Sequence, residues 1–280
     1  MPPPHAPSRP SRPDRTAEAL DGTAPRTPLD WAASLRDEDL PGLVREALAQ
    51  GRARLAFQPV MTAGDAGAPA RLAFHEAFIR LLDEGGRLLP AGAFMATVEE
   101  SGLGRELDCA SLRLGLETLR AHPRARLAVN MSARSIGDGA WRRILEAGLA
   151  GVGDPGPRLI LEISETSAML LPEVVMRFMA EMQPKGVSFA LDDFGAGLIA
   201  FRHLKDFLFD CVKVDRMWVA GLDGQPDNQV LCEALITVAH QFEMFAVAEG
   251  VETEGEAAAL RALGVDCLQG YLFGRPQPTL

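Results

Sequence analysis

Short apolar runs alternate with amphipathic segments along most of this chain, and that alternation limits the fold more than any other feature of the sequence. The runs are rich in valine, isoleucine, leucine and phenylalanine, which is typical of strands buried on both faces. The eight runs lie at residues 54–60, 71–81, 126–130, 158–163, 187–192, 211–215, 245–249 and 266–270. Strands separated by helices predict an α/β fold with a mainly parallel sheet.

Helical patterns fill most of the intervals between the runs. We expect helices over residues 38–50, ended by Gly51, over 172–182 and over 229–242. The last of these is predicted to bury one apolar face, made of Val230, Leu231, Ala234, Leu235, Val238, Ala239 and Phe242. Eight strands with helices between them fit a (β/α)8 barrel. An open doubly wound sheet is the main rival, but the first run ends without the glycine-rich turn of such a sheet.

The organisation of the 280 residues is predicted to be simple. We expect a disordered tail rich in proline and arginine over residues 1–35 and a single barrel domain over residues 36–280. No apolar run reaches the roughly 18 residues of a membrane span, and no secretory signal is apparent. The four cysteines form no C-x-x-C pair, so we expect free thiols and a cytoplasmic location.

Polar side chains mark the ends of the predicted strands, where pure core would be expected. The set comprises Glu76 within the second run, Asn130, Glu162 with Glu165 just beyond it, Asp192 and Asp193, Lys213 and Asp215, Glu249 followed by Glu252, and Gln269. A single case would only mark where a strand meets solvent. In a barrel, however, the ends of consecutive strands converge on the face that carries active sites.

A ring of inward-facing carboxylates repels itself unless it is given counter-charge, and one lysine is too little. Divalent cations supply that charge, and oxygen ligands favour Mg²⁺ or Mn²⁺. The adjacent Asp192 and Asp193 suit a site where two ions share a bridging group, as in phosphoryl displacement, and Lys213 could orient or deprotonate a water there. The residues therefore indicate metal-assisted hydrolysis of a phosphate ester. A net charge of −10 argues against a nucleic-acid polymer as partner.

Eight short motifs, in this order, resemble those of the EAL-domain cyclic-di-GMP phosphodiesterases, over about residues 52–276. They are Phe57-Gln58-Pro59, Glu76-Ala77-Phe78 with Arg80, Val129-Asn130-Met131-Ser132, Leu161-Glu162-Ile163-Ser164-Glu165, Asp192-Asp193-Phe194-Gly195, Val212-Lys213-Val214-Asp215, Ala248-Glu249-Gly250-Val251-Glu252-Thr253 and Gln269-Gly270-Tyr271. Each motif alone is weak, but the ordered set is specific.

The resemblance implies a TIM-like barrel with an antiparallel first strand, a homodimer, and hydrolysis of cyclic-di-GMP to linear pGpG with two Mg²⁺ or Mn²⁺ ions. It implies that the first ion is bound by Glu76, Asn130, Glu162 and Asp192, the second by Asp193 and Asp215, with Glu249 in the shell of metal and water. It further implies that Lys213 positions or activates the attacking water and that Gln269 is a polar partner of that water. It implies that Arg80 contacts a substrate phosphate and that Gln58 lies near a guanine. Glu165 and Glu252 are implied to support the neighbouring loops.

Two departures from the family pattern leave alternatives open. Phe78 stands where the signature has leucine, a mild change that keeps an apolar side chain. Residues 196–200 read Ala-Gly-Leu-Ile-Ala where the family usually has Thr-Gly-Tyr-Ser-Ser. Lost hydrogen bonds behind metal ligands commonly cost about 10–100-fold in affinity or activity. The first alternative is thus a weak or inactive EAL domain that acts as a cyclic-di-GMP receptor or scaffold. The other is an unrelated metal-dependent barrel enzyme, which would not bind cyclic-di-GMP.

Overall fold

The computed structural model describes residues 39–64, 69–89, 91–98, 101–151, 153–197 and 204–280. Residues 41–280 form one compact unit. The predicted tail over residues 1–35 and the last three residues of the altered 196–200 segment lie outside the described residues. No described helix is both long enough and apolar enough to cross a membrane.

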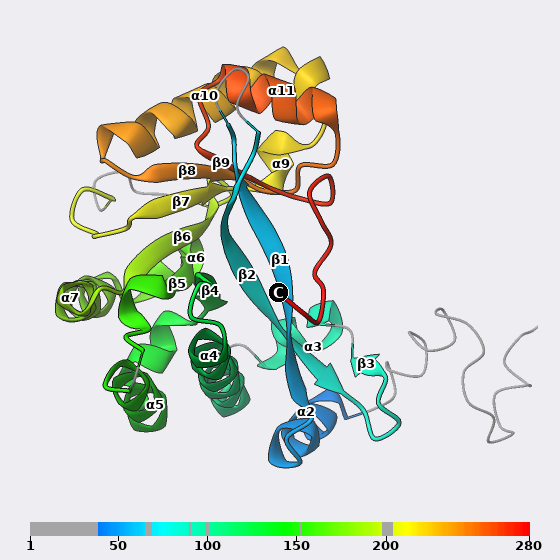
Figure 1. The fold of residues 1–280 in the computed structure, drawn as a ribbon, viewed down its shortest axis with the longest axis vertical. Helices are drawn as coiled ribbons and strands as arrows, with labels where there is room; N and C mark the ends of the chain where they lie inside the picture. The colour runs from blue at the N-terminus through cyan, green and yellow to red at the C-terminus, as the bar shows by residue number, and fades with distance from the viewer. Residues whose placement is uncertain (1–38, 65–68, 90, 99–100, 152, 198–203) are drawn as a thin grey trace, which may run out of the picture. The chain divides into compact units, whose positions relative to one another are not determined.

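Eight strands of the described chain close a barrel, as the sequence predicts (Figure 1). They are β1 (Ala53–Thr62), β2 (Leu72–Leu82), β4 (Leu127–Asn130), β5 (Leu159–Ser164), β6 (Ser188–Phe194), β7 (Cys211–Val214), β8 (Phe245–Ala248) and β9 (Cys267–Gln269). β1 pairs antiparallel with both β2 and β9, whereas the pairs from β2–β4 round to β8–β9 are parallel. The TIM-like barrel with an antiparallel first strand is therefore confirmed. The two-residue strand β3 (Leu88–Leu89), which pairs with the end of β2, was not predicted.

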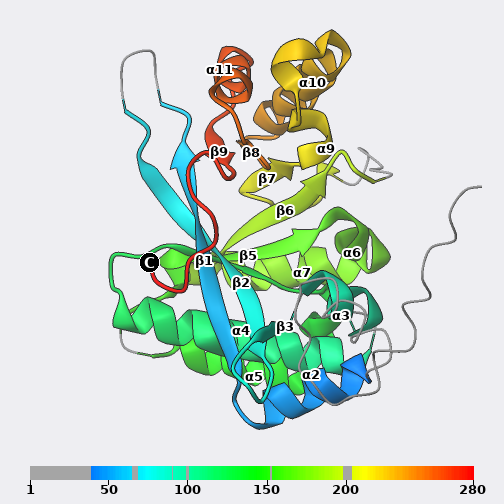
Figure 2. The same ribbon diagram turned by 90° about the vertical axis from the view of Figure 1, so that its right-hand side faces the viewer.

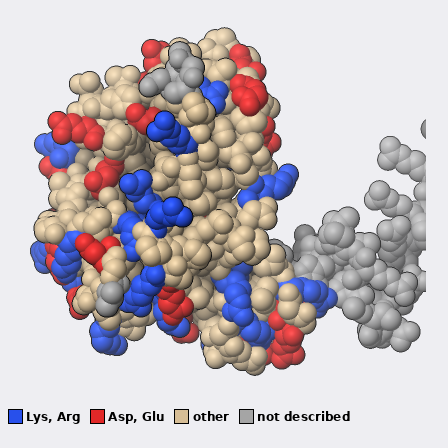
Figure 3. Space-filling view, viewed as in Figure 1, with Lys and Arg blue, Asp and Glu red and all other residues tan. Residues whose placement is uncertain are grey.

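Helices surround the outside of the barrel. They are α2 (Leu40–Ala49), α3 (Ala91–Val98), α4 (Gly102–Ala121), α5 (Gly139–Leu149), α6 (Glu165–Leu170), α7 (Pro172–Met182), α9 (Arg216–Val219), α10 (Pro226–Gln241) and α11 (Glu254–Ala262). Helices α4, α5 and α7 lie beside β4–β6, and α10 and α11 lie beside β7–β9 (Figures 1 and 2). Acidic and basic side chains are interspersed on the face shown in Figure 3.

The core has two layers because successive side chains of a strand point to opposite faces. A large cluster fills the space between strands and helices. A second, small cluster is built around Val60, Phe74, Ala128 and Val247. Each of its members lies two residues from a polar residue of the same strand or its end, namely Gln58, Glu76, Asn130 and Glu249. The interior of the barrel therefore has an apolar floor beneath a polar mouth.

The predicted buried face of α10 is only partly correct, since Ala239 is buried and Leu235 and Val238 pack against the core. Val230 and Leu231 of that face are, however, 65% and 43% exposed, whereas Cys232 and Ile236, which were not predicted, are buried. Small or aliphatic residues occur all round this helix, so the hydrophobic pattern does not select one face. Packing selects it instead, with the Cys232 thiol donating to the backbone oxygen of Trp218 on α9 at 3.6 Å.

Candidate metal and catalytic site

Strand register brings the predicted site residues to one end of the barrel. Gln58 on β1 pairs directly with Glu76 on β2, and Asn130 on β4 pairs with Glu162 on β5. The remaining members come from the carboxyl ends of β6 to β9, where the parallel strands of a barrel present their side chains to a common mouth.

Lys213 lies at the centre of the site and has no exposed surface. Its Nζ atom is 2.8 Å from Glu76 Oε2 and 3.1 Å from Glu162 Oε2. It is also 3.3 Å from Asp192 Oδ1 and 2.5 Å from Glu249 Oε1. One ammonium thus faces four carboxylates. A single positive charge cannot offset four carboxyl groups in their ionised form, so the site favours either protonation of some of them or additional positive charge.

Glu76 is the most completely bonded of these carboxylates. Its Oε1 atom accepts a hydrogen bond from Asn130 Nδ2 at 2.8 Å. Its Oε2 atom accepts from Gln269 Nε2 at 2.7 Å, as well as from Lys213. Gln269 also donates to Gln58 Oε1 at 3.2 Å, and Gln58 Nε2 donates to the Gly274 oxygen at 2.9 Å. This chain of amides fixes the orientation of Glu76.

The two fully buried glutamates differ in charge state. Burial pushes the pKa of Glu76 upward, but the charge of Lys213 and the hydrogen bonds from Lys213, Gln269 and Asn130 outweigh it and lower that pKa. Burial and the neighbouring charge of Glu76 raise the pKa of Glu162 well above its ordinary value. Glu76 therefore carries the negative charge, and Glu162 is the group that gains most from additional positive charge.

Burial and the charges of neighbouring groups also shift the pKa values of Lys213 and Glu249. Burial lowers the pKa of Lys213, but the charges of Asp192, Glu162, Glu249 and Glu76 outweigh it, and its pKa is raised well above the ordinary value. Lys213 is thus an ammonium. Burial, followed by the charges of Asp192 and Glu76, raises the pKa of Glu249 to about 8 despite the opposing charge of Lys213.

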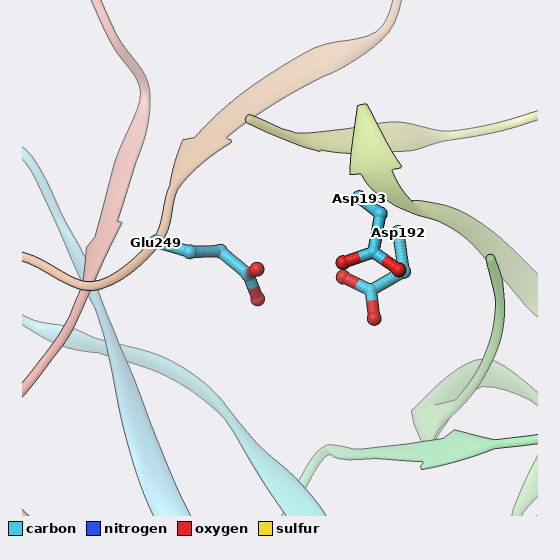
Figure 4. Close-up of side chains that lie close together, drawn as sticks. All are labelled: Asp192, Asp193 and Glu249. Atoms are coloured by element: carbon cyan, nitrogen blue, oxygen red, sulfur yellow. The ribbon is translucent and has the colours of Figure 1, made fainter. Parts of the chain in front are cut away.

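An acidic cluster lies beside Lys213. Oxygen atoms of Asp192, Asp193 and Glu249 lie within 4.8 Å of one another, and the three carboxylates face a common space (Figure 4). Asp193 has a left-handed backbone, with φ of 57°. Burial and the charges of Asp192 and Asp215 raise the pKa of Asp193 to about 6. Asp215 follows β7, and its Oδ1 atom accepts from the Met217 backbone N–H at 2.7 Å, which caps α9.

The donor set fits divalent cations. Glu162 Oε1, Asp192 Oδ1 and Gln269 Oε1 are buried and accept no hydrogen bond, although Asp192 Oδ1 lies near Lys213. Buried acceptors without a donor are costly and rare. Carboxylate and amide oxygens that lack donors, gathered beside an acidic cluster, are the ligands that Mg²⁺ and Mn²⁺ prefer.

Three of the predicted site residues lie outside this network. Glu165 is buried at the start of α6, and its Oε2 atom accepts from the Gly195 N–H at 3.2 Å, so it contacts the turn after β6. Arg80 is half-buried on β2 with its guanidinium 5.4 Å from the Phe78 ring centroid. Burial lowers its pKa, whereas the charges of Tyr271 and Glu76 oppose that shift. Glu252 is exposed.

The sequence did not predict a role for two residues that support the site. Glu256 is buried and accepts from the N–H groups of Gly221, Glu252 and Thr253, so it holds the loop after β8. The Thr-x-x-Glu spacing of a capping box could have indicated it. Trp218 donates from its indole N–H to the Gly195 oxygen at 3.0 Å. No pattern in the sequence predicts that bond.

The sequence model of the EAL domain family matches residues 43–276 of this chain. The chain belongs to the EAL domain family. Among curated EAL relatives, cyclic di-GMP phosphodiesterase NbdA of Pseudomonas aeruginosa is 30% identical over 240 residues, which cover 84% of this chain and 30% of NbdA. The chain therefore spans less than a third of the length of that curated relative.

Solved EAL structures agree with the fold. The EAL domain of FimX from Pseudomonas aeruginosa, bound to c-di-GMP, superposes with a TM-score of 0.77 at 26% identity, covering 86% of this chain and 97% of that one. The phosphodiesterase MucR of Pseudomonas aeruginosa, in complex with c-di-GMP, gives a TM-score of 0.74 at 28% identity, covering 86% and 98%. Both similarities cover most of this chain.

Proposed function

We propose that this EAL domain hydrolyses one phosphodiester bond of cyclic-di-GMP and releases linear pGpG. The observation that carries the proposal is the buried ammonium of Lys213 facing four carboxylates, next to buried oxygens that have no hydrogen-bond donor. The nature of the substrate is supported by the family, by the similarity to a protein named as a cyclic di-GMP phosphodiesterase, and by structures solved with c-di-GMP.

The ligand residues divide into two sets. One Mg²⁺ or Mn²⁺ ion would be held by Glu76, Asn130, Glu162 and Asp192, the other by Asp193 and Asp215, with Glu249 beside both. Bound there, two such ions would polarise a phosphoryl oxygen and make a water more acidic, which is the chemistry of two-metal phosphodiesterases.

The protein's own groups bind and orient the reactants. Lys213 is held as an ammonium, so it donates hydrogen bonds and positions the attacking water or a phosphate oxygen. Gln269 and Gln58 form the amide chain that fixes Glu76 and line the same end of the barrel. Arg80, half-buried on β2, would balance the charge of a substrate phosphate. Glu165 begins α6 directly after β5, and Glu252 lies in the loop that follows β8.

The test is incubation of the purified chain with cyclic-di-GMP and Mg²⁺ or Mn²⁺, with products separated by chromatography. We expect pGpG, its loss on chelation, and its return when the metal is restored. Lys213→Ala and Glu76→Ala should each lower turnover by about 10²-fold or more, the usual cost of misplacing a reacting group. Lys185→Ala, which removes an exposed lysine paired with Glu181, is the matched control and should retain activity. Equal turnover by Lys213→Ala and the control would contradict the role of Lys213.

A second candidate function rests on the altered turn after β6. Ala196 and Gly197 are its described members, and Ala196 replaces a hydroxyl residue of the family pattern. If the chain binds cyclic-di-GMP tightly in the same assay but forms no pGpG, it is a receptor or scaffold. The homodimer, the cytoplasmic location and the disordered tail stay predictions.

A further inference from the structure

The turn that carries Asp192 and Asp193 has an unusual backbone. Asp193 has a φ of 57°, and Gly195 has a φ of 89°. The Ala196 N–H donates to the Asp193 oxygen at 3.0 Å, which closes the turn. A left-handed conformation is unfavourable for a non-glycine residue and persists where surrounding contacts impose it. The contacts of this turn therefore decide where the Asp193 carboxylate points.

Two side chains hold Gly195 through its backbone polar groups. Glu165 Oε2 accepts from the Gly195 N–H at 3.2 Å, and the Trp218 indole donates to the Gly195 oxygen at 3.0 Å. A Cβ atom on Gly195 would lie only 2.8 Å from Leu235 Cδ1 and 3.0 Å from Trp218 Nε1. The glycine is thus pressed against the indole, and no larger residue fits there without a shift.

Trp218 also belongs to the segment that carries the other proposed ligand. It lies on α9, whose first turn is capped by Asp215 through the Met217 N–H. The Asp215 N–H in turn donates to the Phe194 oxygen at 3.2 Å. The indole bond therefore ties the turn bearing Asp193 to the segment bearing Asp215. Gly195 is two residues from Asp193, and Trp218 is three residues from Asp215.

We propose that Trp218 is a positioning residue, which sets the spacing of the Asp193 and Asp215 carboxylates through its bond to Gly195 and so tunes the affinity of the second divalent cation. The inference rests on the proposed function for the identity of the ion. Phenylalanine in this position would fill nearly the same space but could not donate. Removing a hydrogen bond behind a metal ligand commonly weakens metal binding by about 10–100-fold.

The chain offers a matched control in Trp141. Its indole on α5 is buried, its Nε1 atom makes no hydrogen bond, and it packs on Phe178 with ring centroids 5.7 Å apart. Trp141→Phe therefore removes an indole without removing a hydrogen bond. Trp218→Phe removes both. Thermal melts of the two variants show whether each remains folded.

The experiment is a titration of the full chain with Mn²⁺ alone, followed by electron paramagnetic resonance of the free ion. We expect two ions per chain for the wild type and for Trp141→Phe, with one of the two bound about 10–100-fold more weakly in Trp218→Phe. In turnover assays, Trp218→Phe should need more Mn²⁺ but approach the wild-type rate at saturation. Equal Mn²⁺ affinities in the two variants would overturn the proposal, as would a wild-type chain that binds fewer than two ions. Intact Mn²⁺ binding without pGpG would contradict only the proposed hydrolysis.

Discussion

Replacing Lys213 with methionine tests the electrostatic account of the site most directly. Methionine keeps most of the volume of the lysine stem but removes the charge. In the variant, the carboxyl groups of Glu76, Glu162, Asp192 and Glu249 lose the ammonium that contacts all four of them at 2.5 to 3.3 Å. We expect the metal-free variant to be much less stable than the wild type.

The magnitude follows from the burial of both partners. The Lys213 and Glu162 side chains have no exposed area, and Glu76 has 3%. Removing one member of a buried ion pair typically lowers the free energy of unfolding by about 3–5 kcal/mol. At about 2–4 °C per kcal/mol for a domain of this size, the melting temperature should fall by roughly 6–20 °C. Divalent cations should restore part of that loss, by about 2.7 kcal/mol at 100 times their dissociation constant.

The assay is urea unfolding at pH 7, once with EDTA and once with Mn²⁺. Lys185→Met is the control, because that lysine is 42% exposed and its contact with Glu181 is 3.7 Å. Exposed pairs contribute at most about 1 kcal/mol, so the control should change little. If metal-free Lys213→Met unfolds within 0.5 kcal/mol of the control, roughly the scatter of a surface substitution, the carboxylates do not depend on Lys213.

Three further outcomes follow from the contacts at the mouth. Metal-free protein should lose thermal stability as pH rises from about 4.5 to 8, because Glu249 and Asp193 have raised pKa values of about 8 and 6, so the folded state keeps protons that the unfolded chain releases. Thermal melts across this range would refute the idea if stability rose. Gly270→Ala should destabilise by about 1–3 kcal/mol or more in urea, since its Cβ would lie 1.9 Å from the Val251 oxygen. Glu256→Ala should cost about 1–3 kcal/mol by leaving three N–H groups without their acceptor, and urea curves matching wild type would exclude that role.

The convergence of the site residues could be predicted because it depends on two short-range rules. Side chains alternate along a strand, and parallel strands of a barrel end on one face. Lys213 and Glu162 each lie on a short strand, where that alternation places their side chains inside. The antiparallel first strand, by contrast, was implied by the resemblance, since no periodicity distinguishes the direction of β1.

Contacts made by loops could not be predicted in the same way. Glu165 and Gly195 are 30 residues apart, and Trp218 and Gly195 are 23 apart. Their hydrogen bonds depend on where the turn after β6 runs relative to α6 and α9. Side-chain alternation along strands does not determine that position. The buried face of α10 was predicted only in part for a related reason, because the packing of this helix on α9 outweighs a weak hydrophobic pattern.

The hydrogen bonds also indicate where positive charge is lacking. Glu76 accepts hydrogen bonds from Asn130, Gln269 and Lys213, so the protein itself supplies donors that stabilise the charge of this carboxylate. Glu162 and Asp192 each keep a buried oxygen that accepts no hydrogen bond. The lack of positive charge and hydrogen-bond donors is therefore greatest on the side of Lys213 that faces β5 and β6. A cation bound on that side would relieve the most repulsion, while Glu76 would be one of its proposed ligands and would also hold Lys213 in place. Substitution of Glu76 should accordingly disturb the position of Lys213 as well as metal affinity.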